Sequence, residues 1–294
     1  MKVFTYFSIW AVLLTSLFTA CKMNDEKNTE IAQAMQEKPE IRLYTFDGGT
    51  VQVNALELFS QDSVYKGKSK EFANAFYVIE HPKGTMMWDA GLPEALVPMV
   101  EPYTTPDGNF TVSRSDSVQN QLAKAGMTLG DIDYLALSHT HFDHSGHAAR
   151  MGKSTWLVQK SEYDFITSPE VQKSYPDEYN AIKDIKNLKQ LDGDYDVFGD
   201  GSVVIKLMPG HTPGHSVLYL DLKEHGPVLL TGDLYHLYAN RKNKRVPIFN
   251  YDVKQTLESM DRFEVFAEQT GAEVYLQHQK EDFEKMPKAP KFLN

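Results

Sequence analysis

The sequence predicts an α+β fold in which β-strands supply most of the core. Short apolar or alternating runs, which are typical of strands, recur between residues 41 and 278, whereas helical spacing of apolar residues is clear in only a few stretches. Histidines and aspartates directly follow several of these runs, where a barrel or a sandwich presents side chains at its strand ends. The 294 residues, 41% of them hydrophobic, suit one large globular domain or two modest ones.

The first element is an N-terminal segment, residues 1–20, that resembles a bacterial lipoprotein signal peptide. Residues 3–18 are almost uncharged and apolar, and small residues precede Cys21. The lipobox would be Phe18-Thr19-Ala20-Cys21, in which Phe18 replaces the usual leucine. We therefore expect an exported bacterial lipoprotein, periplasmic or associated with the outer membrane, and tethered to the membrane through lipidated Cys21. An uncleaved N-terminal anchor is the alternative.

A tether and two strand pairs follow. Residues 21–39 are polar and charged, which predicts a flexible tether that leads into a single domain, residues 40–294. Residues 41–46 and 50–53 alternate on either side of Asp47-Gly48-Gly49, a pattern that predicts a hairpin. A second strand pair is predicted over 75–80 and 85–89.

An irregular stretch and the first helix come next. Four prolines within residues 92–112 predict a loop without regular structure. In residues 115–125, Val118, Leu122 and Ala125 recur at helical spacing. The apolar run 134–137 then predicts a buried strand.

The second half of the chain supplies a further strand and helix, an insertion and the second sheet. Residues 154–158 read as a strand and 160–166 as a helix, whereas the polar and aromatic segment 168–185 is expected to lie outside the core. The remaining predicted elements are strands at 203–207, 217–220 and 228–230, a helix at 253–266, and a last strand that ends just before His278.

The segment Ser138 to His147 carries four histidines and one aspartate between a predicted strand and a helix. His139 and His141, two positions apart as the chain leaves the strand, can point the same way, while Asp143 and His144 turn toward a neighbouring position. One segment can therefore serve two metal ions. Chance clustering on a polar loop is the alternative, and it weakens because further histidines and an aspartate follow later strand-like runs, namely His211, Asp233 and His278.

This ligand set resembles that of the metallo-β-lactamase superfamily, and the resemblance covers roughly residues 40–285. It implies an αββα sandwich with two mixed sheets face to face, helices outside, and a metal site at one edge of the sheets. It also implies that His139, His141 and His211 bind one metal ion, that Asp143, His144 and His278 bind the other, and that Asp233 bridges them. Nitrogen and oxygen ligands suit zinc and also accept iron, manganese or cobalt, and we expect two zinc ions.

A metal pair of this kind predicts hydrolysis. Two divalent ions about 3.5–4 Å apart can share one water molecule and lower its pKa from about 15.7 toward ~7. The expected reaction is therefore attack of a metal-bridging hydroxide on an ester, lactone, thioester or amide carbonyl, with Asp143 and Asp233 counted among the catalytic residues.

Several neighbouring residues are candidates for supporting roles. The Trp88-Asp89-Ala90-Gly91 turn resembles a family turn whose aspartate supports the ligands from outside, so we expect this role of Asp89. His147 and His215 lie near the ligands but match no ligand position. For each we expect either a role in supporting a ligand or facing the substrate, or a plain structural role.

The residues after Asp233 differ from those of the family. In the N-acyl-homoserine lactonases, a tyrosine three positions beyond the bridging aspartate is thought to contact the carbonyl or leaving-group oxygen. Here His236 occupies that position and Tyr235 precedes it, so both are candidate catalytic residues, and the hypothesis is that His236 supplies the polar contact. A surface histidine is the alternative.

Composition excludes several partners and activities. The net charge of −10 and the pI of about 5.5 argue against nucleic acid. Cys21 is the only cysteine, so it can form no intramolecular disulfide, and class B β-lactamases that need a cysteine ligand are ruled out. The β-lactamases that use Asp-His-His on the second metal lack the bridging aspartate, so Asp233 argues against this class as well. Glyoxalase II thioesterases resemble the chain in all seven ligands, but only 16 residues follow His278, too few for their C-terminal helical region.

The resemblance is strongest to the quorum-quenching N-acyl-homoserine lactonases. We expect the aromatic loop 163–179 and the proline-rich stretch 92–106 to line an acyl-chain groove. The alternative enzymatic function is hydrolysis of aryl esters or organophosphates, as in a related enzyme. The alternative without catalysis is a tethered, metal-dependent binding protein. The sequence is compatible with a homodimer and does not fix the oligomeric state.

Overall fold

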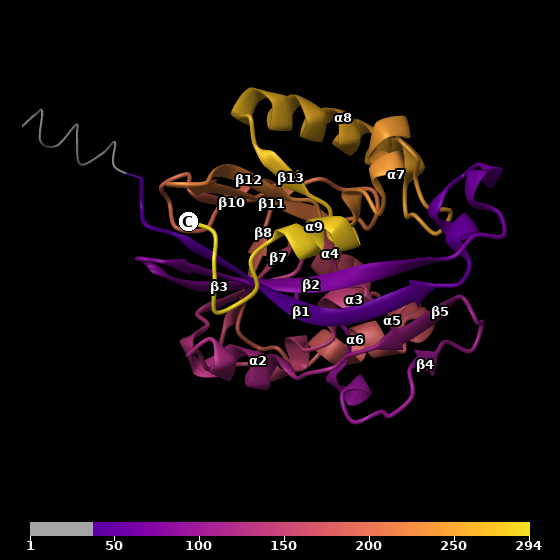
Figure 1. Ribbon diagram of the computed structural model, residues 1–294, viewed down its shortest axis with the longest axis horizontal. Coiled ribbons are helices and arrows are strands. Elements are labelled where there is room, and N and C mark those ends of the chain that lie inside the picture. The colour runs from indigo at the N-terminus through magenta and orange to yellow at the C-terminus, as the bar shows by residue number, and fades with distance from the viewer. Residues whose placement is uncertain (1–37) are drawn as a thin grey trace, which may run out of the picture. The chain divides into compact units, whose positions relative to one another are not determined.

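Two β-sheets face each other across a hydrophobic core in the computed structural model, which describes residues 38–294 (Figure 1). Helices cover the outer face of each sheet, so the layers follow the order αββα. This layering confirms the predicted fold class. Pro39–Asn294 form one compact unit, whereas the predicted signal peptide, Cys21 and the tether up to residue 37 lie outside the described residues.

The first sheet has eight strands in the order β4-β5-β1-β2-β3-β6-β7-β8. β1, β2 and β3 pair antiparallel, whereas β3, β6, β7 and β8 are parallel neighbours. Parallel strands place their carboxyl ends at one edge of the sheet, and the histidine-rich segment starts at the end of β6. The bounds are β1 Arg42–Val53, β2 Lys70–His81, β3 Gly84–Trp88, β4 Tyr103–Thr104, β5 Phe110–Ser113, β6 Tyr134–Ala136, β7 Thr155–Gln159 and β8 Leu188–Leu191.

The second sheet has five strands in the order β13-β12-β11-β10-β9. Its pairs are antiparallel, except that β12 and β13 run parallel. The strands predicted at 203–207, 217–220 and 228–230 are all present in it. The bounds are β9 Tyr195–Asp196, β10 Val203–Leu207, β11 Ser216–Leu222, β12 Gly226–Leu230 and β13 Glu273–Tyr275.

The described part of the chain contains eight α-helices besides short 3-10 turns. They are α2 Val118–Lys124, α3 Phe142–Ser145, α4 Lys160–Ile166, α5 Pro169–Ser174, α6 Pro176–Ile182, α7 Tyr238–Asn243, α8 Val253–Thr270 and α9 Lys280–Lys285. The longest, α8, begins where the Asp252 side chain accepts a hydrogen bond from the Gln255 amide, and it ends at Gly271 in the left-handed conformation. No helix among residues 38–294 is both long and apolar enough to span a membrane.

Alternation along the strands separates two layers of the core. Leu43 and Ile79 point between the sheets, where they join Leu218 and Val228 of the second sheet. Their neighbours along β1 and β2 point to the opposite face and pack under α2, α5 and α6. On the other side of the sandwich, α8 packs its buried residues, Met260, Phe263 and Ala267, against Val217 and Leu229. The period of two in β1 and β2 therefore fills two layers at once.

The predicted hairpin over residues 41–53 is wrong, because β1 is one strand that carries a bulge. Both halves of β1 pair with β2, and the register shifts between Asp47 and Gly49. Asp47 Oδ1 accepts a hydrogen bond from the Gly49 amide at 2.8 Å, and Gly49 has φ +120°. Asp-Gly-Gly favours a bulge as well as a turn. Because β2 is long enough to pair on both sides of the bulge, the chain continues instead of reversing.

Two segments differ from expectation: residues 92–112, expected to be an irregular loop, and residues 168–185, expected to lie outside the core. Within 92–112, β4 and β5 form an antiparallel pair that extends the edge of the first sheet. Within 168–185, α5 and α6 bury Val171 and Ile182 against the outer face of the first sheet. This segment therefore contributes to the core as well as to the surface, contrary to the expectation.

Candidate metal centre

The histidine-rich segment joins β6 to the short helix α3. His139 follows the strand end, His141 occupies the residue before the helix, and Asp143 and His144 lie within its single turn. The loop between the strand and the helix is therefore shorter than predicted, because the helix already begins at Phe142. The turn of α3 moves Asp143 and His144 to a second position beside the one that His139 and His141 face.

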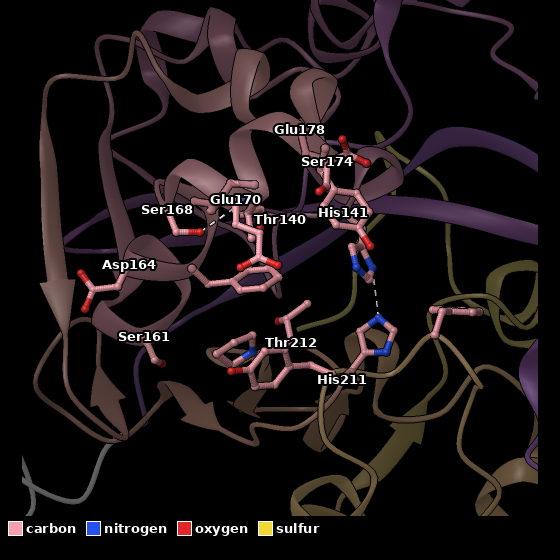
Figure 2. A pocket seen from close by; sticks show the side chains of 17 residues that line it. Thr140, His141, Ser161, Asp164, Ser168, Glu170, Ser174, Glu178, His211 and Thr212 are labelled. Atoms are coloured by element: carbon pink, nitrogen blue, oxygen red, sulfur yellow. Dashed lines mark hydrogen bonds between the residues drawn. The ribbon is translucent and has the colours of Figure 1, made fainter.

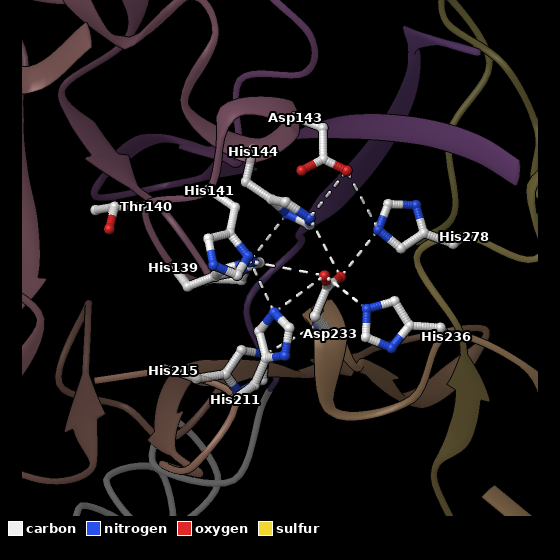
Figure 3. Close-up of polar contacts among 12 residues, drawn as sticks. His139, Thr140, His141, Asp143, His144, His211, His215, Asp233, His236 and His278 are labelled. Atoms are coloured by element: carbon white, nitrogen blue, oxygen red, sulfur yellow. Dashed lines mark hydrogen bonds and ion pairs between the residues drawn. The ribbon is translucent and has the colours of Figure 1, made fainter. Parts of the chain in front are cut away.

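All seven predicted ligands come together at the edge of the sandwich (Figure 3). His139, His141, His211 and Asp233 form one group, and Asp143, His144 and His278 form another, each with ligand atoms within 4.8 Å of one another. His141 Nδ1 lies 2.8 Å from His139 Nε2 and 3.1 Å from His211 Nε2. The later strands deliver the partners: His211 precedes β11, Asp233 follows β12, and His278 follows β13.

Asp233 lies between the two groups, with one carboxylate oxygen toward each. Its Oδ2 is 3.6 Å from His139 Nε2 and 3.4 Å from His211 Nε2. Its Oδ1 is 3.2 Å from His144 Nε2 and 2.9 Å from His278 Nε2. Asp143 Oδ2 completes the second group at 3.8 Å and 3.6 Å from the same two nitrogens. This is the arrangement expected of a bridging carboxylate.

The donor set fits two divalent cations. His144 Nε2 and Asp233 Oδ1 are buried and lie 3.2 Å apart, and neither has a hydrogen-bond partner among residues 38–294. Buried polar atoms are rarely left unpaired, and here both face the centre of the ligand cluster. Imidazole nitrogens and carboxylate oxygens are ligands that zinc accepts.

Charge is distributed unevenly between the two groups. Burial and neighbouring imidazoles hold the pKa of His139 and of His141 well below the usual value. Burial acts in the same direction on His144, but the carboxylates of Asp233, Asp143 and Asp89 outweigh it and raise the His144 pKa well above the usual value. The pKa of His278 is also raised, because Asp233 and Asp143 outweigh its burial. Without metal, the imidazoles of His139 and His141 favour the neutral form, whereas those of His144 and His278 attract protons.

Both imidazole rings of the second group are held by hydrogen bonds at the nitrogen that faces away from the centre. His144 Nδ1 lies 3.0 Å from Asp89 Oδ2, and Asp89 Oδ1 also accepts a hydrogen bond from the Ser138 amide at 2.7 Å. His278 Nδ1 donates to the Ala73 carbonyl at 2.9 Å. Asp89 therefore occupies the supporting position expected of it, in a left-handed backbone conformation with φ +59°.

The first group is held through the main chain by a residue that the sequence did not reveal. Glu162 is buried in α4, and its carboxylate accepts hydrogen bonds from the Thr140 amide at 2.9 Å, the Thr140 hydroxyl at 2.8 Å and the Gly214 amide at 2.9 Å. Thr140 lies between two ligands, and Gly214 lies three residues beyond His211. One carboxylate thus ties the two ligand-bearing loops together. A lone glutamate in a predicted helix gives no signal of this role.

His215 and His147 have different surroundings. His215 Nδ1 donates to the Met208 carbonyl at 3.0 Å, and its Nε2 accepts a hydrogen bond from the Asp233 amide at 2.9 Å. Burial lowers its pKa to about 3, which keeps the ring neutral and able to accept. His147 instead faces Glu94, with Nδ1 2.9 Å from Glu94 Oε1, and burial lowers the His147 pKa to about 4. His215 supports the bridging aspartate, and His147 is structural.

A seam of glycines packs main chain against main chain beneath α3. The Gly146 amide donates to the Gly91 carbonyl at 2.9 Å, and a Cβ atom on Gly146 would overlap the Leu92 carbonyl carbon. Gly91 in turn lies against Gly48 in the bulge of β1, where its Cβ would come within 2.7 Å of the Gly48 Cα. The seam leaves no room for a side chain at these contacts.

His236 lies at the centre, and its position rules out the surface alternative. Its Nε2 is 3.0 Å from Asp233 Oδ2, its ring stacks on that of His278 with an interplanar angle of 8°, and only 2% of the residue is exposed. Its Nδ1 is buried without a partner. Burial lowers the pKa of His236 to about 4, so the ring is neutral near pH 7.

The expectation of a catalytic role for Tyr235 is wrong. The Tyr235 hydroxyl donates to Glu264 Oε1 at 2.8 Å, and its ring packs on Phe263 of α8. The side chain therefore points into the core between α8 and the second sheet, away from the ligands. Successive residues on this extended segment face opposite ways, so only one of Tyr235 and His236 can reach the centre.

Two cavities meet at the metal centre. The first, of about 550 Å³, is mainly apolar and contacts Asp233, His236 and His278. Its apolar walls are Val51, Leu58, Phe59, Phe72, Phe110, Phe142, Ile248 and Phe249. Of the stretches expected to line an acyl-chain groove, loop 163–179 supplies Tyr175 and Glu178 to this cavity and 92–106 supplies nothing, whereas β1, β5 and residues 248–249 supply apolar walls. The second cavity, of about 650 Å³, lies against His141 and His211 (Figure 2).

Comparison with known proteins agrees with this geometry. Residues 70–270 match the model of the metallo-beta-lactamase superfamily. The N-acyl homoserine lactonase AttM of Azorhizobium caulinodans is 28% identical over 271 residues, which cover 87% of this chain and 99% of that protein. An N-acyl homoserine lactonase of a Bacillus species is 31% identical over 196 residues, or 63% of this chain and 73% of that protein.

A solved structure is similar over nearly the same range. It is an N-acyl homoserine lactone hydrolase with the product N-hexanoyl-L-homoserine bound at its catalytic metal centre. The two structures align with a TM-score of 0.74 and 25% sequence identity, covering 87% of this chain and 100% of that one. These matches confirm the resemblance inferred from the seven ligands.

Proposed function

This chain belongs to the metallo-β-lactamase superfamily, and from that premise we propose that it hydrolyses the lactone ring of N-acyl homoserine lactones. The observation that carries the proposal is the junction of the apolar cavity with the seven-ligand centre. An amphiphilic lactone needs both features, a surface that buries its acyl chain and a centre that acts on its ring ester. The similarity to N-acyl homoserine lactonases over 87% of the chain supports it.

The ligand set would hold two cations, which we propose to be zinc. His139, His141 and His211 would hold one, Asp143, His144 and His278 the other, and Asp233 would lie between them. When bound, such a pair polarises a carbonyl and makes water nucleophilic near neutral pH. The chain itself orients the ligands through Asp89, Glu162 and the Ala73 carbonyl.

The apolar cavity would hold the acyl chain. Phe59, Phe110 and Phe142 contribute aromatic faces to its walls, and the cavity reaches Asp233 and His278 at its inner end. Each methylene group that moves from water into such a cavity gains about 0.8 kcal/mol. We therefore expect kcat/KM to rise with acyl-chain length until the cavity is filled.

His236 would position the bridging aspartate through its Nε2. A neutral imidazole carries one ring proton, and with Nε2 3.0 Å from Asp233 Oδ2 that proton is placed to be donated to the carboxylate. The remaining nitrogen, Nδ1, is buried and has no hydrogen-bond partner among residues 38–294. The hypothesis that His236 also replaces the family tyrosine in a direct polar contact stays a prediction.

The test is acid release from a defined lactone. The purified full chain, loaded with zinc in detergent solution, is mixed with N-octanoyl homoserine lactone, and the acid formed is titrated at constant pH. We expect one equivalent of acid per lactone consumed, and none from the metal-free protein. Absence of acid release, beside rapid turnover of an aryl phosphotriester, would favour the organophosphate alternative instead.

We also propose that the chain is exported and tethered by a lipid on Cys21. The proposal rests on the apolar residues 3–18 and the small residues before Cys21, which lie outside the described part of the structure. Metabolic labelling with a radioactive fatty acid tests it. The wild-type chain should carry label and sediment with membranes, and the Cys21→Ser variant should do neither. Equal labelling of both would refute lipidation at this residue.

A further inference from the structure

The second cavity has features that the proposed lactone does not use. It lies beside His141 and His211, and it shares His141, Tyr175, Glu178 and Phe249 with the apolar cavity. A substrate that spans the metal centre can therefore extend into both. Figure 2 shows carboxylates and hydroxyl groups along this cavity.

Its charged lining is acidic. Asp164, Glu170 and Glu178 line the cavity, and no lysine or arginine does so among residues 38–294. Asp164 is already paired with Lys160 outside the cavity, whereas Glu170 and Glu178 have no ion-pair partner in the described chain. Glu178 is half-buried, and burial raises its pKa, the direction that an incoming cation would reverse.

A buried hydroxyl also lacks a partner here. Thr212, the residue after the ligand His211, is 1% exposed, and its Oγ1 forms no hydrogen bond within the described chain. It lines the same cavity (Figure 2). Leaving a buried hydroxyl unpaired costs free energy, so this position points to a polar ligand or to the polar part of a substrate.

Aromatic rings surround these polar groups. Phe165 and Tyr251 meet edge to face with centroids 5.5 Å apart, and Tyr175 and Phe249 form the wall shared with the apolar cavity. Aromatic faces beside carboxylates recognise ammonium groups, because the ring quadrupole and the negative charge attract the same cation. A neutral sugar-like group would use the hydroxyls and leave the carboxylates unpaired.

We propose that the second cavity binds an ammonium group carried by the alcohol part of the substrate. The acyl chain would lie in the apolar cavity, the ester carbonyl at the metal centre, and the cationic alcohol part beside Glu170, Glu178 and Thr212. The inference rests on the proposed ester hydrolysis, and it extends the substrate class from plain lactones to acyl esters and lactones with a cationic substituent.

A matched pair of non-hydrolysable probes tests it by binding alone. One is the octanoyl amide of 2-aminoethyl-trimethylammonium, and the other is the octanoyl amide of 3,3-dimethylbutylamine, its neutral isostere. Their dissociation constants are measured calorimetrically with the zinc-loaded full chain. We expect the cationic probe to bind about tenfold more tightly, the size of effect that one cation–π contact and a partly exposed ion pair provide together.

Variants assign the preference to the cavity. The double variant Glu170→Gln, Glu178→Gln should bind both probes with similar affinity. Glu268→Gln, which removes a charge from an exposed position on α8, is the control and should keep the wild-type preference. Thermal unfolding of each variant checks that the fold is intact.

The outcomes separate this inference from the proposed function, because binding needs no turnover. Equal affinities of the wild type for both probes, or an unchanged preference in the double variant, would overturn the cationic site. Tighter binding of a hydroxylated neutral probe, the octanoyl amide of serinol, than of the cationic probe would also overturn it. A clear cation preference in a protein that releases no acid from the lactone would overturn the proposed function alone.

Discussion

The two halves of the metal centre are held in place by different means. In the three-histidine half, Glu162 binds backbone amides of the loops that carry the ligands. In the other half, Asp89 and the Ala73 carbonyl bind the ligand rings of His144 and His278 themselves. In the first half a carboxylate thus holds the main chain, and the rings of His139 and His211 contact only the neutral side chains of Ser138 and Asn250 at their outer nitrogens. In the other half a carboxylate contacts the ring of His144 itself.

The two halves also differ in the pKa values of their imidazole ligands. In the three-histidine half, burial and neighbouring imidazoles depress the pKa values of His139 and His141, so these two rings are ready as neutral ligands. Where carboxylates act on the rings, the imidazole pKa values are raised, so a metal ion there must displace protons. Asp233 belongs to both halves, and changing it should affect both.

The largest effect is expected from Asp233→Asn. The variant loses the negative charge between the two groups, so kcat/KM for the lactone should fall more than about 100-fold, beyond the usual effect of residues that only support ligands. Elemental analysis should find fewer than two ions per chain. A variant that retained two ions and normal turnover would contradict the bridging arrangement.

Asp89→Asn should weaken only the second half. The amide cannot accept from both the Ser138 amide and His144 Nδ1 in the way the carboxylate does. We expect about 10–100-fold weaker binding of one ion of the pair. A spectrophotometric titration with Co²⁺ counts the two binding steps. Equal weakening of both steps would show that the halves are not supported separately.

Glu162→Gln is the matched change in the first half. The new NH2 group would face the Gly214 or the Thr140 amide, donor against donor, in a buried position. The free energy of unfolding should fall by about 1–3 kcal/mol, the cost of an unsatisfied buried group. The Co²⁺ titration should show weaker binding at the step that Asp89→Asn leaves intact. Weakening of the same step in both variants would remove the distinction.

His236→Phe should have a smaller effect on turnover. The ring that stacks on His278 is kept, but the bond to Asp233 Oδ2 is lost, so kcat should fall about tenfold with little change in KM. His236→Gln restores a donor and should recover part of the loss. Unchanged kcat and KM in the phenylalanine variant would remove His236 from the mechanism.

The smallest effect concerns His147, which belongs to neither half. Burial lowers the pKa of His147 to about 4, whereas in an unfolded chain the pKa of its imidazole is near the usual value of 6.5. Between these values the unfolded chain binds more protons, so the contribution of neutral His147 is complete above pH 6.5 and declines as the pH falls toward 4. Urea unfolding at pH 7 and pH 5 should show a smaller pH-dependent loss in His147→Gln. An equal loss in both proteins would contradict this assignment.

Simple patterns in the sequence predicted the strand-rich core and the ligand cluster, whereas the order of the layers was implied by the resemblance to a family. Strand ends carry the ligands, and His139 and His141 mark theirs by spacing. The hairpin prediction failed because Asp47-Gly48-Gly49 suits a bulge as well as a turn, and only the length of β2 decides between them. The positions of Tyr235 and Glu162 could not be predicted, since each depends on which distant element, α8 or the ligand loops, lies opposite the side chain.

The walls of the apolar cavity could not be predicted for a similar reason. Aromatic residues in loop 163–179 suggested an apolar wall, but most of this loop faces the acidic cavity. The apolar cavity is built from residues far apart in the chain, such as Phe59, Phe110 and Phe249. A cavity formed by such distant segments leaves no local pattern to read.

The glycine seam under α3 sets a limit on how this enzyme can change. Gly48, Gly91 and Gly146 bring three backbone segments into direct contact, and any added methyl group would act as a wedge between the first sheet and the helix that carries Asp143 and His144. The distance between the two ligand groups is thus set by contacts between backbone segments, and not by side chains that substitutions could change. Substrate specificity can therefore change through substitutions of the side chains that line the two cavities, whereas the three glycines beneath the ligands cannot be replaced.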